Sequence, residues 1–354
     1  MCKILTHYRK YAIMSAIDCV DSEALFGGYT LTITDVSRAL GVSKTTVSRA
    51  MSGTGRLSDE TRSRVLKYIA KTGFRPNAAA SNLATTKTRN IAYAMPLGQT
   101  ALTSSYFLEC LFGVSGAASD AQYDVIVIED EPDELKRIIS SRKVDGVILS
   151  SNRHGDDALA GLVGAGVPIV LTGSSNVPDI IQISYDARAA FRQITSKLID
   201  AWDTKIALVL TLSGYAPNIT RAEGYTDAFT ARGIMSPTIC WDANDEQAVC
   251  DILVEQYNDG VRGFICGDDT VCSIILTILS NRNYGKSNLE QIDAESIRLA
   301  SFHNNRFLKS FHPEIPVVEM DPYELGRFAA RMAIHKIDGD AVPRTTLLEY
   351  TLRM

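Results

Sequence analysis

Residues 32–76 constrain the fold of this chain most strongly, because caps, apolar positions and glycines recur there at the spacing of three short helices. Thr32 can cap the first helix, and Asp35 is placed to return the hydrogen bond. Gly41 then introduces a turn. The side chains expected on the buried face of this helix are Val36, Ala39 and Leu40.

The second helix is expected to run from Lys44 to about Met51, with Ser43 as its cap. Val47, together with Ala50, is its expected contribution to a core. The remaining side chains are predicted to face outward, namely Lys44, Thr45, Thr46, Ser48 and Arg49. Such a face is unusual for a helix that has only a structural role.

Ser58 is expected to cap a third helix, which packs Val65, Leu66 and Ile69 and ends at Gly73. Two helices around a tight turn, braced by a third, form a helix-turn-helix. The helical pattern alone fits any compact three-helix bundle with a solvated face equally well.

The distribution of charge favours a nucleic-acid-binding role for this segment. Residues 30–90 carry 11 Lys or Arg against 3 Asp or Glu, whereas residues 91–354 carry 22 against 35. The formal charge of the whole chain, −5, therefore conceals a basic head on an acidic body. Because a basic domain that binds phosphates gains from counterion release, we expect the head to bind DNA.

The runs TITDVSRALGVSKTTVSRAMSG and SDETRSRVLKYIAKTGFRPNAAASNL resemble, without gaps, the head of the lactose- and galactose-repressor (LacI) family. The resemblance implies that the second helix lies in the major groove. The base-reading positions of the family correspond here to Lys44, Thr45 and Arg49. Thr46, Ser48 and Asn77 are better suited to phosphate contacts, which fix register without reading sequence.

Residues 77–89 are expected to form a short hinge helix and a linker. A helix of this length is marginal alone in water. In the family, the matching segment folds on the operator, where a Leu, here Leu83, wedges between base steps in the minor groove. The alternative is a plain flexible linker whose Leu83 packs on the domain below.

From residue 90 onward, apolar runs such as DVIVIED, VPIVLTG and KIALVLTL alternate with amphipathic stretches. This rhythm is typical of a parallel sheet covered by helices on both faces. It predicts two halves, one of about residues 90–200 plus 320–340 and one of about residues 203–319 plus 341–354. Helices are expected over residues 186–201, 220–232, 246–257 and 323–337, and a last strand over residues 345–352.

The predicted fold class is therefore an all-α helix-turn-helix head followed by an α/β core of two doubly wound parallel-sheet subdomains. Residues 89–354 resemble the effector-binding core of the LacI family, which is similar to periplasmic sugar-binding proteins. Open α/β sheets bind ligands beyond the carboxyl ends of their strands, so two facing halves leave a cleft between those ends.

Strand ends indicate which residues line this cleft. Tyr106 and Phe107 follow the first strand and are suited to stack on a sugar face or a base. By resemblance, Arg221 binds ligand hydroxyls or a carboxylate, and Asp269 and Asp186 bind hydroxyls. An Arg and an Asp across a cleft suit a polyol. The structural alternatives are helix caps for the two Asp residues and a surface ion pair for Arg221.

Some positions depart from the family pattern. His303 stands directly after the strand LASF, where the family often has Asp. Tyr215, a further candidate effector contact, and Pro217 occupy a loop in which some members place small polar or basic residues. These differences argue against carrying over a lactose or purine specificity, and we expect a sugar or a sugar derivative.

The sequence contains no recognisable catalytic constellation. Asp268 and Asp269 are adjacent at a helix start and therefore cannot flank a glycosidic bond. The run YGKS at residues 284–287 follows a helix where a phosphate loop would follow a strand. The five His form no metal-binding spacing, and no Gly-x-Ser-x-Gly occurs. We therefore expect neither an enzyme nor a metal or other cofactor.

Seven Cys without a CxxC motif are typical of core residues in a reducing cytosol. No apolar run is long enough to span a membrane. Residues 1–29 lack a secretion signal. They are expected to be a disordered tail or the result of a start codon assigned too early, with Met14 as the alternative start; a functional arm is the third possibility.

These patterns predict a cytoplasmic, homodimeric transcription regulator, expected to repress carbohydrate-utilisation genes. Two heads would bind a near-palindromic operator in double-stranded DNA, because one head reads only a few base pairs. A small sugar-type effector in the cleft would control this binding. The alternative is a cytoplasmic α/β sugar-binding or sugar-modifying protein whose basic head has another role.

Overall fold

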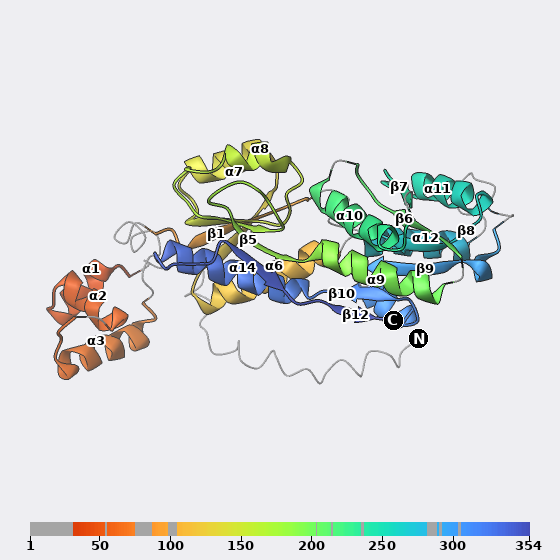
Figure 1. The fold of residues 1–354 in the computed structure, drawn as a ribbon. Helices are drawn as coiled ribbons and strands as arrows, with labels where there is room; N and C mark the ends of the chain where they lie inside the picture. Colours follow the sequence, from red (N-terminus) through yellow and green to blue (C-terminus); the bar gives the residue numbers. More distant parts are fainter. Residues whose placement is uncertain are drawn as a thin grey trace, which may run out of the picture. The chain divides into compact units, whose positions relative to one another are not determined.

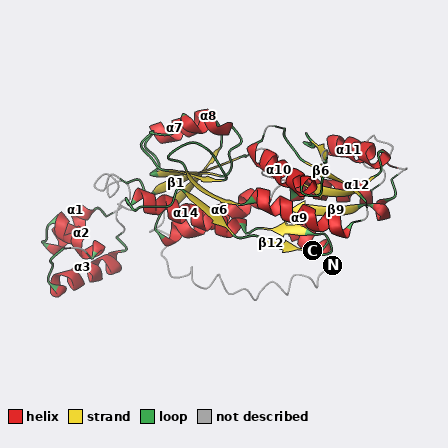
Figure 2. Ribbon diagram, in the orientation of Figure 1, coloured by secondary structure: helices red, strands yellow, loops and turns green. Residues whose placement is uncertain are grey.

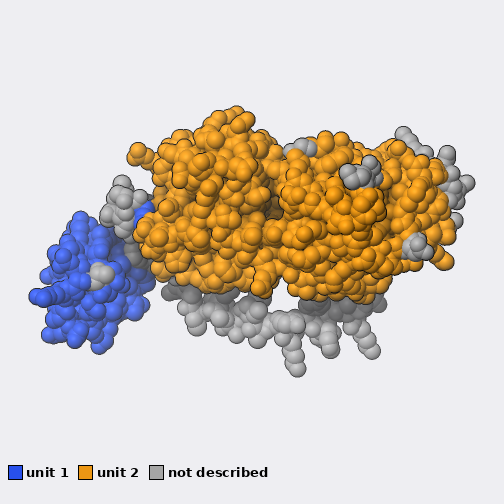
Figure 3. All heavy atoms as spheres, in the orientation of Figure 1, with its two compact units in different colours: residues 1–87 blue, residues 88–354 orange. Residues whose placement is uncertain are grey.

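The computed structural model of the chain (Figure 1) describes residues 31–53, 55–74, 87–97, 105–202, 204–213, 215–234, 237–281, 289, 292–303 and 306–354. The predicted N-terminal extension and the predicted DNA contacts Asn77 and Leu83 lie outside these residues. The chain divides into two compact units, residues 1–87 and 88–354 (Figure 3).

The first unit contains the three predicted helices, α1 (Ile33–Leu40), α2 (Lys44–Ser52) and α3 (Asp59–Thr72). Each begins at its predicted cap, because the side-chain oxygens of Thr32, Ser43 and Ser58 accept a backbone N–H from three residues ahead. Asp35 completes the capping box of α1. Each helix ends at a glycine in the left-handed conformation.

The core of this unit consists of Val36, Val47, Ala50, Val65 and Phe74. The prediction of a buried position is wrong for two residues: Leu66 is 43% exposed, and Ala39 is also exposed. Successive helix positions are about 100° apart, so a helix that buries Val65 turns Leu66 outward. Helix α1 packs instead through Ile33, Val36 and Leu40, which leaves Ala39 to one side.

Helix α3 also holds the other two helices through its arginines. The Arg64 guanidinium donates to the carbonyl of Leu40 at the end of α1 (3.1 Å), and Arg62 donates to the carbonyl of Gly53 just after α2 (3.4 Å). The last carbonyls of a helix lack intrahelical partners. The third helix therefore braces the motif by hydrogen bonds as well as by packing.

The second unit contains two six-stranded sheets, each between layers of helices (Figure 2). The first has the order β11-β5-β4-β3-β1-β2 and parallel neighbours throughout. Its strands are β1 (Asn90–Met95), β2 (Asp124–Glu129), β3 (Gly146–Leu149), β4 (Ile169–Thr172), β5 (Ile181–Tyr185) and β11 (Thr345–Leu348). Its helices are α6 (Ser105–Asp120) and α14 (Pro322–Ile337) on one face, and α7 (Pro132–Ser140) and α8 (Gly155–Ala160) on the other.

The second sheet has the order β12-β10-β9-β8-β6-β7 and is parallel except for β12. Its strands are β6 (Lys205–Val209), β7 (Thr238–Cys240), β8 (Val261–Cys266), β9 (Arg298–Phe302), β10 (Val317–Glu319) and β12 (Thr351–Arg353). Helices α9 (Ala187–Ala201) and α10 (Ala216–Thr230) cover one face, and α11 (Glu246–Asn258) and α12 (Asp269–Ser280) cover the other. The short elements η3 (Ala294–Ser296) and α13 (Arg306–Phe311) flank β9.

The structure corrects the predicted halves in two places. Helix α9 belongs to the second half and not to the first, because Phe191 stacks on Phe302 of β9 and Gly224 lets α10 approach the α9 backbone. The single strand predicted over residues 345–352 is two strands: β11 pairs with β5 in the first sheet, and β12 pairs with β10 in the second. Helix α10 also begins at Ala216, earlier than predicted.

The halves are joined where the chain passes from β5 to α9, from β10 to α14 and from β11 to β12. The Tyr185 hydroxyl ties two of these connections together. It donates to the backbone carbonyl of Asp321 (2.7 Å) and accepts from the Asp321 N–H (2.9 Å). None of the described helices combines the length and the apolar composition needed to cross a membrane.

The start of the core is fixed by a carboxylate. Asp145, just before β3, accepts hydrogen bonds from the backbone N–H groups of Thr88 (2.7 Å) and Arg89 (2.8 Å) and from the Thr88 hydroxyl (2.9 Å). Thr88 and Arg89 therefore belong to the core, two residues earlier than predicted.

Candidate functional site

Helix α2 carries the polar surface of the head. Lys44, Thr45, Ser48 and Arg49 are exposed, as predicted for side chains that face outward. Thr46 is half-buried: its backbone N–H donates to Ser43 Oγ (3.1 Å), and its hydroxyl lies 2.8 Å from the same oxygen. The first turn of α2 contains no acidic residue. The helix therefore offers hydrogen-bond donors and positive charge without a neighbouring carboxylate of its own.

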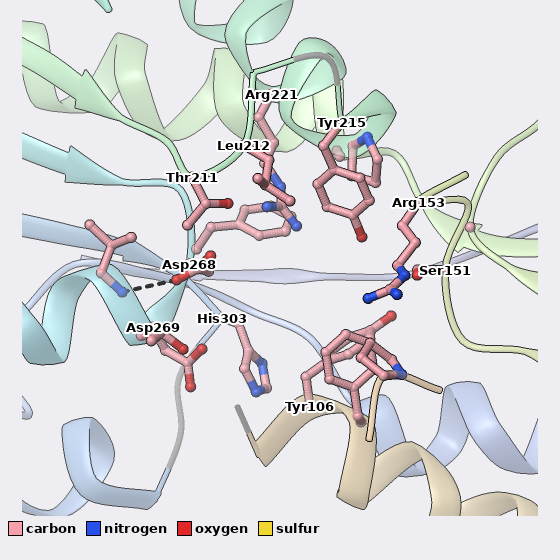
Figure 4. Close-up of a pocket in the computed structure, with 18 of the residues that line it drawn as sticks. Tyr106, Ser151, Arg153, Thr211, Leu212, Tyr215, Arg221, Asp268, Asp269 and His303 are labelled. Carbon is pink, nitrogen blue, oxygen red and sulfur yellow. Dashed lines mark hydrogen bonds between the residues drawn. The ribbon is translucent and has the colours of Figure 1, made fainter. Parts of the chain in front are cut away.

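A cleft of about 1370 Å³ lies in the core where the strands of both sheets end. The first half contributes residues after β1, β3 and β4, and the second half contributes residues after β6, β8 and β9. The structure brings all six predicted effector contacts to this cleft: Tyr106, Phe107, Asp186, Tyr215, Arg221 and Asp269. Figure 4 shows four of them facing a common space.

Arg221 extends from α10 into the cleft (Figure 4). Its Nη1 donates to Asn218 Oδ1 (2.9 Å), and its guanidinium carbon lies 4.8 Å from the centre of the Phe302 ring. The buried Asn218 amide in turn donates to Thr211 and to the Leu212 carbonyl. Within the described residues, no carboxylate lies within 4.0 Å of this guanidinium, which does not fit the alternative of a surface ion pair.

The two aspartates at the start of α12 differ in what they bind. Asp268 caps the helix, because its carboxylate accepts from the Val271 N–H (2.9 Å). Asp269 is the first residue of the helix, is only 1% exposed and is not the capping residue. The helix-cap role considered for Asp269 therefore belongs to Asp268. Asp186 does cap α9, through the Ala189 N–H (2.9 Å), although it also lines the cleft.

The cleft tyrosines are held as hydrogen-bond donors. Tyr106 places its ring edge-on to Phe107 (5.5 Å between centroids) and to His303 (5.9 Å). Burial raises the pKa of Tyr106 and of Tyr215 above the ordinary value, while Arg221 acts in the opposite direction on both. A hydrogen bond with Ser151, which comes from the other half, also lowers the Tyr215 pKa. Both phenols therefore keep their protons at neutral pH.

His303 lines the cleft but was recognised in the sequence only as a departure from the family pattern. Burial and, to a smaller extent, Arg221 lower its pKa to about 4, so the ring is neutral near pH 7. Its position at the end of β9 is the signal that could have found it.

Arg153, at the opposite wall of the cleft, was also missed. It lies among Asp130 (Nε to Oδ1, 3.0 Å), Glu131 and His154, whose Nε2 accepts from its Nε (3.1 Å). These three residues bring their ligand atoms within 4.8 Å of one another, but the guanidinium already supplies positive charge there. Strand ends again provide the sequence signal, because Asp130 and Arg153 follow β2 and β3.

A basic helix-turn-helix head joined to a two-part α/β core with a ligand cleft defines the class of ligand-controlled DNA-binding regulators. Two family models match the chain. Residues 32–77 match "Bacterial regulatory proteins, lacI family", and residues 99–352 match "Periplasmic binding proteins and sugar binding domain of LacI family".

Similar proteins are regulators as well. Catabolite control protein A of Staphylococcus aureus is 26% identical over 316 residues, which cover 86% of this chain and 91% of that protein. The lac repressor dimer bound to operator and the anti-inducer ONPF has a TM-score of 0.76 at 18% identity, covering 92% of this chain and 98% of that one. The transcriptional regulator CelR in complex with cellobiose has a TM-score of 0.65 at 22% identity, with the same coverage.

The chain belongs to the LacI family of bacterial transcription regulators. The predicted fold class is confirmed, and the protein is a DNA-binding regulator that takes an effector, not an enzyme.

Proposed function

We propose that the protein is a cytoplasmic repressor of carbohydrate-utilisation genes that binds a near-palindromic operator as a homodimer. A small sugar-type ligand in the cleft controls this binding. The observation that carries the proposal is the cleft itself, where aromatic rings, a guanidinium and a buried carboxylate converge from both halves. This combination suits a polyhydroxylated ring with one apolar face.

On the DNA side, α2 is the proposed recognition helix. Lys44 and Arg49 can donate to guanine edges, and Thr45 can contact a thymine methyl group. Thr46, Ser48 and Asn77 are proposed phosphate contacts. Leu83 is proposed to wedge between base steps of the minor groove.

The surface of the first half supports dimerisation. Leu108 and Phe112 are 42% and 63% exposed and stand one turn apart on α6. Val127 on the edge strand β2 is 40% exposed, and strand alternation places it on the sheet face that α6 covers. Exposed apolar side chains gathered in this way favour burial against a second copy.

Control by a ligand requires that it bind one arrangement of the two halves better than another. The cleft lies between the halves, and three connections join them, so closure around a ligand would turn one half against the other. In a dimer this turn would change the spacing of the paired hinge segments and hence operator affinity.

The test uses the full chain, with fluorescence anisotropy on operator and scrambled duplexes and a thermal-shift panel of sugars, sugar phosphates and sugar acids. We expect Arg221→Ala to keep operator affinity but lose the response to the ligand. A matched control is Arg232→Ala, whose guanidinium pairs with Asp200 outside the cleft lining (2.7 Å).

We expect Leu83→Ala to weaken operator binding and to leave ligand affinity unchanged.

Each assignment has its own contrary result. An Arg221→Ala protein that responds at the same ligand concentration as the wild type would refute the pocket assignment. Equal operator affinity of wild type and Leu83→Ala would refute the wedge. Equal binding to operator and scrambled duplexes would favour the alternative, a sugar-binding protein whose basic head serves another purpose.

A further inference from the structure

In the described core, Arg221 makes no ion pair, because no carboxylate lies within 4.0 Å of its guanidinium. Its Nε is buried and has no hydrogen-bond partner there, while Nη1 donates only to the neutral amide of Asn218. Other arginines of the core contact carboxylates, for example Arg153 with Asp130 and Arg188 with Asp227. Arg221 is instead positioned by an amide and by the face of Phe302.

His303 lies beside this guanidinium and is only 4% exposed. Neither Nδ1 nor Nε2 has a hydrogen-bond partner among the residues that the structure describes. The backbone holds the residue in place, because its N–H donates to the Val318 carbonyl (3.0 Å) and its carbonyl accepts from Ser301 Oγ (3.1 Å). The Tyr106 ring packs edge-on against the His303 imidazole.

The charged and titratable groups around His303 come from three elements. Tyr106 faces it from α6, Arg221 from α10, and Asp268 and Asp269 stand at the start of α12 (Figure 4). The Asp268 carboxylate is engaged as a helix cap. Arg221 is the charge that acts on His303, and it disfavours the protonated ring.

Desolvating an unpaired guanidinium is unfavourable unless a charge of opposite sign accompanies it. A sugar hydroxyl would satisfy hydrogen bonds of Arg221, but it would bring no negative charge within ion-pair distance of the guanidinium. A carboxylate or phosphate would supply both the acceptors and the charge.

We propose that the effector carries an anionic group, a carboxylate or a phosphate, which binds between Arg221 and His303. The proposal rests on the proposed function, because it concerns the ligand of the same cleft. The sugar ring of such a ligand would then lie toward Asp269 and Tyr215, whose carboxylate and phenol suit hydroxyl groups.

An anion beside His303 also changes its protonation. The negative charge opposes the effect of Arg221 and favours the imidazolium, so binding is accompanied by proton uptake. Because the pKa of the free ring is about 4, affinity for an anionic ligand is then expected to rise as the pH falls from about 6 to about 5, a range in which a carboxylate stays largely ionised. A neutral sugar that binds the neutral ring is expected to show no such rise.

The experiment compares glucuronate, glucose 6-phosphate and inorganic phosphate with glucose, at constant ionic strength, on the full chain. Binding is measured by calorimetry at about pH 5 in two buffers of different ionisation enthalpy, which reports proton uptake. The titration of His303 is followed by NMR and assigned with His303→Asn. We expect at least one anion to bind about tenfold or more tightly than glucose and to raise the His303 pKa by about one unit or more.

Two variants test the assigned residues. His303→Asp places a negative charge beside the anion and is expected to weaken anion binding about tenfold or more. His303→Asn keeps a hydrogen-bonding side chain, so it is expected to bind the anion but without proton uptake. Arg221→Gln is expected to abolish anion binding, and Arg232→Gln is the matched control; unfolding midpoints show that the variants are folded.

The proposal is overturned if glucose binds as tightly as the anions, or if none of the three anions moves the His303 titration. In the first case glucose still occupies the cleft and the proposed function stands. If His303→Asp leaves anion binding unchanged, the anion lies elsewhere. Failure of Arg221→Ala to alter any ligand response would instead contradict the proposed function. Comparing glucuronate with glucose 6-phosphate separates a carboxylate from a phosphate ligand.

Discussion

His303 adopts a φ of 70°, a left-handed backbone conformation that is less strained for Asn than for His. It is also buried and neutral, with a pKa of about 4. Strain and desolvation at one residue that lines a cleft are features of binding sites more often than of packing. In the unfolded chain the imidazole is not buried and its pKa is not lowered. Because the pKa differs between the folded and unfolded states, His303 makes the stability of the core depend on pH.

We expect His303→Asn to flatten the loss of stability of the core in mild acid. The folded pKa lies below the ordinary value of 6.5, so the unfolded state takes up the proton first. The stability contribution is complete above about pH 6.5 and is lost as the pH falls toward 4. Between pH 7 and pH 5 the wild type is expected to lose about 2 kcal/mol more than His303→Asn in urea unfolding of the core. Parallel losses in the two proteins would show that His303 is not neutral in the folded state.

Helices α6 and α14 approach each other so closely that there is no room for a Cβ at Gly113 or Gly326. A Cβ on Gly113 would lie 1.9 Å from the Tyr323 carbonyl oxygen, and one on Gly326 would lie 2.1 Å from the Cys110 carbonyl oxygen. Both obstacles are backbone atoms of the facing helix and cannot move aside independently. The close contact positions Tyr106 and Phe107 at the start of α6, so it belongs to the construction of the cleft.

We expect Gly113→Ala to destabilise the core by about 3 kcal/mol, because the two helices must move apart. Gly116→Ala in the same helix is the matched control, since its Cβ would meet only the ends of the Tyr323 and Arg327 side chains, at 3.4 and 3.6 Å. The control is expected to be neutral or slightly stabilising through helix propensity. Unfolding midpoints in urea measure both, and equal effects of the two substitutions would contradict this account of the α6–α14 contact.

The sequence identifies elements better than it identifies their partners. Caps and glycines located α1, α2 and α3, because these signals depend on local pattern. Strand ends indicated Tyr106 and Phe107, whereas Arg221, Asp269 and Asp186 were predicted from the family resemblance; all five line the cleft. Periodicity shows that α9 has an apolar face but not which sheet covers it, and this assignment failed. Likewise, residues 345–352 read as one extended segment, and only pairing with β5 and β10 divides it. The importance of His303 depends on burial and on a distant Arg, which no local pattern records.

The two halves of the core communicate through their three connections, and Tyr185 is placed to couple two of them. Its hydroxyl is bonded to both backbone groups of Asp321, 136 residues away in the chain, and the residue also lines the cleft. A ligand that closes the cleft must turn the chain at these connections. A bond that holds two connections together makes them move as one.

We expect Tyr185→Phe to loosen both connections at once. Two hydrogen bonds are lost, each with a net contribution of about 1 kcal/mol, while the ring and its packing remain. In hydrogen exchange, protection is expected to fall at the start of α9 and at the start of α14. The matched control is Tyr225→Phe, which removes a bond within the second half, from the Tyr225 hydroxyl to the Ile206 carbonyl (2.9 Å). Its effect is expected to be confined to α10 and β6. If Tyr185→Phe alters exchange at only one of the two connections, they are not coupled through this hydroxyl, and ligand closure must be transmitted by the remaining contacts between the halves.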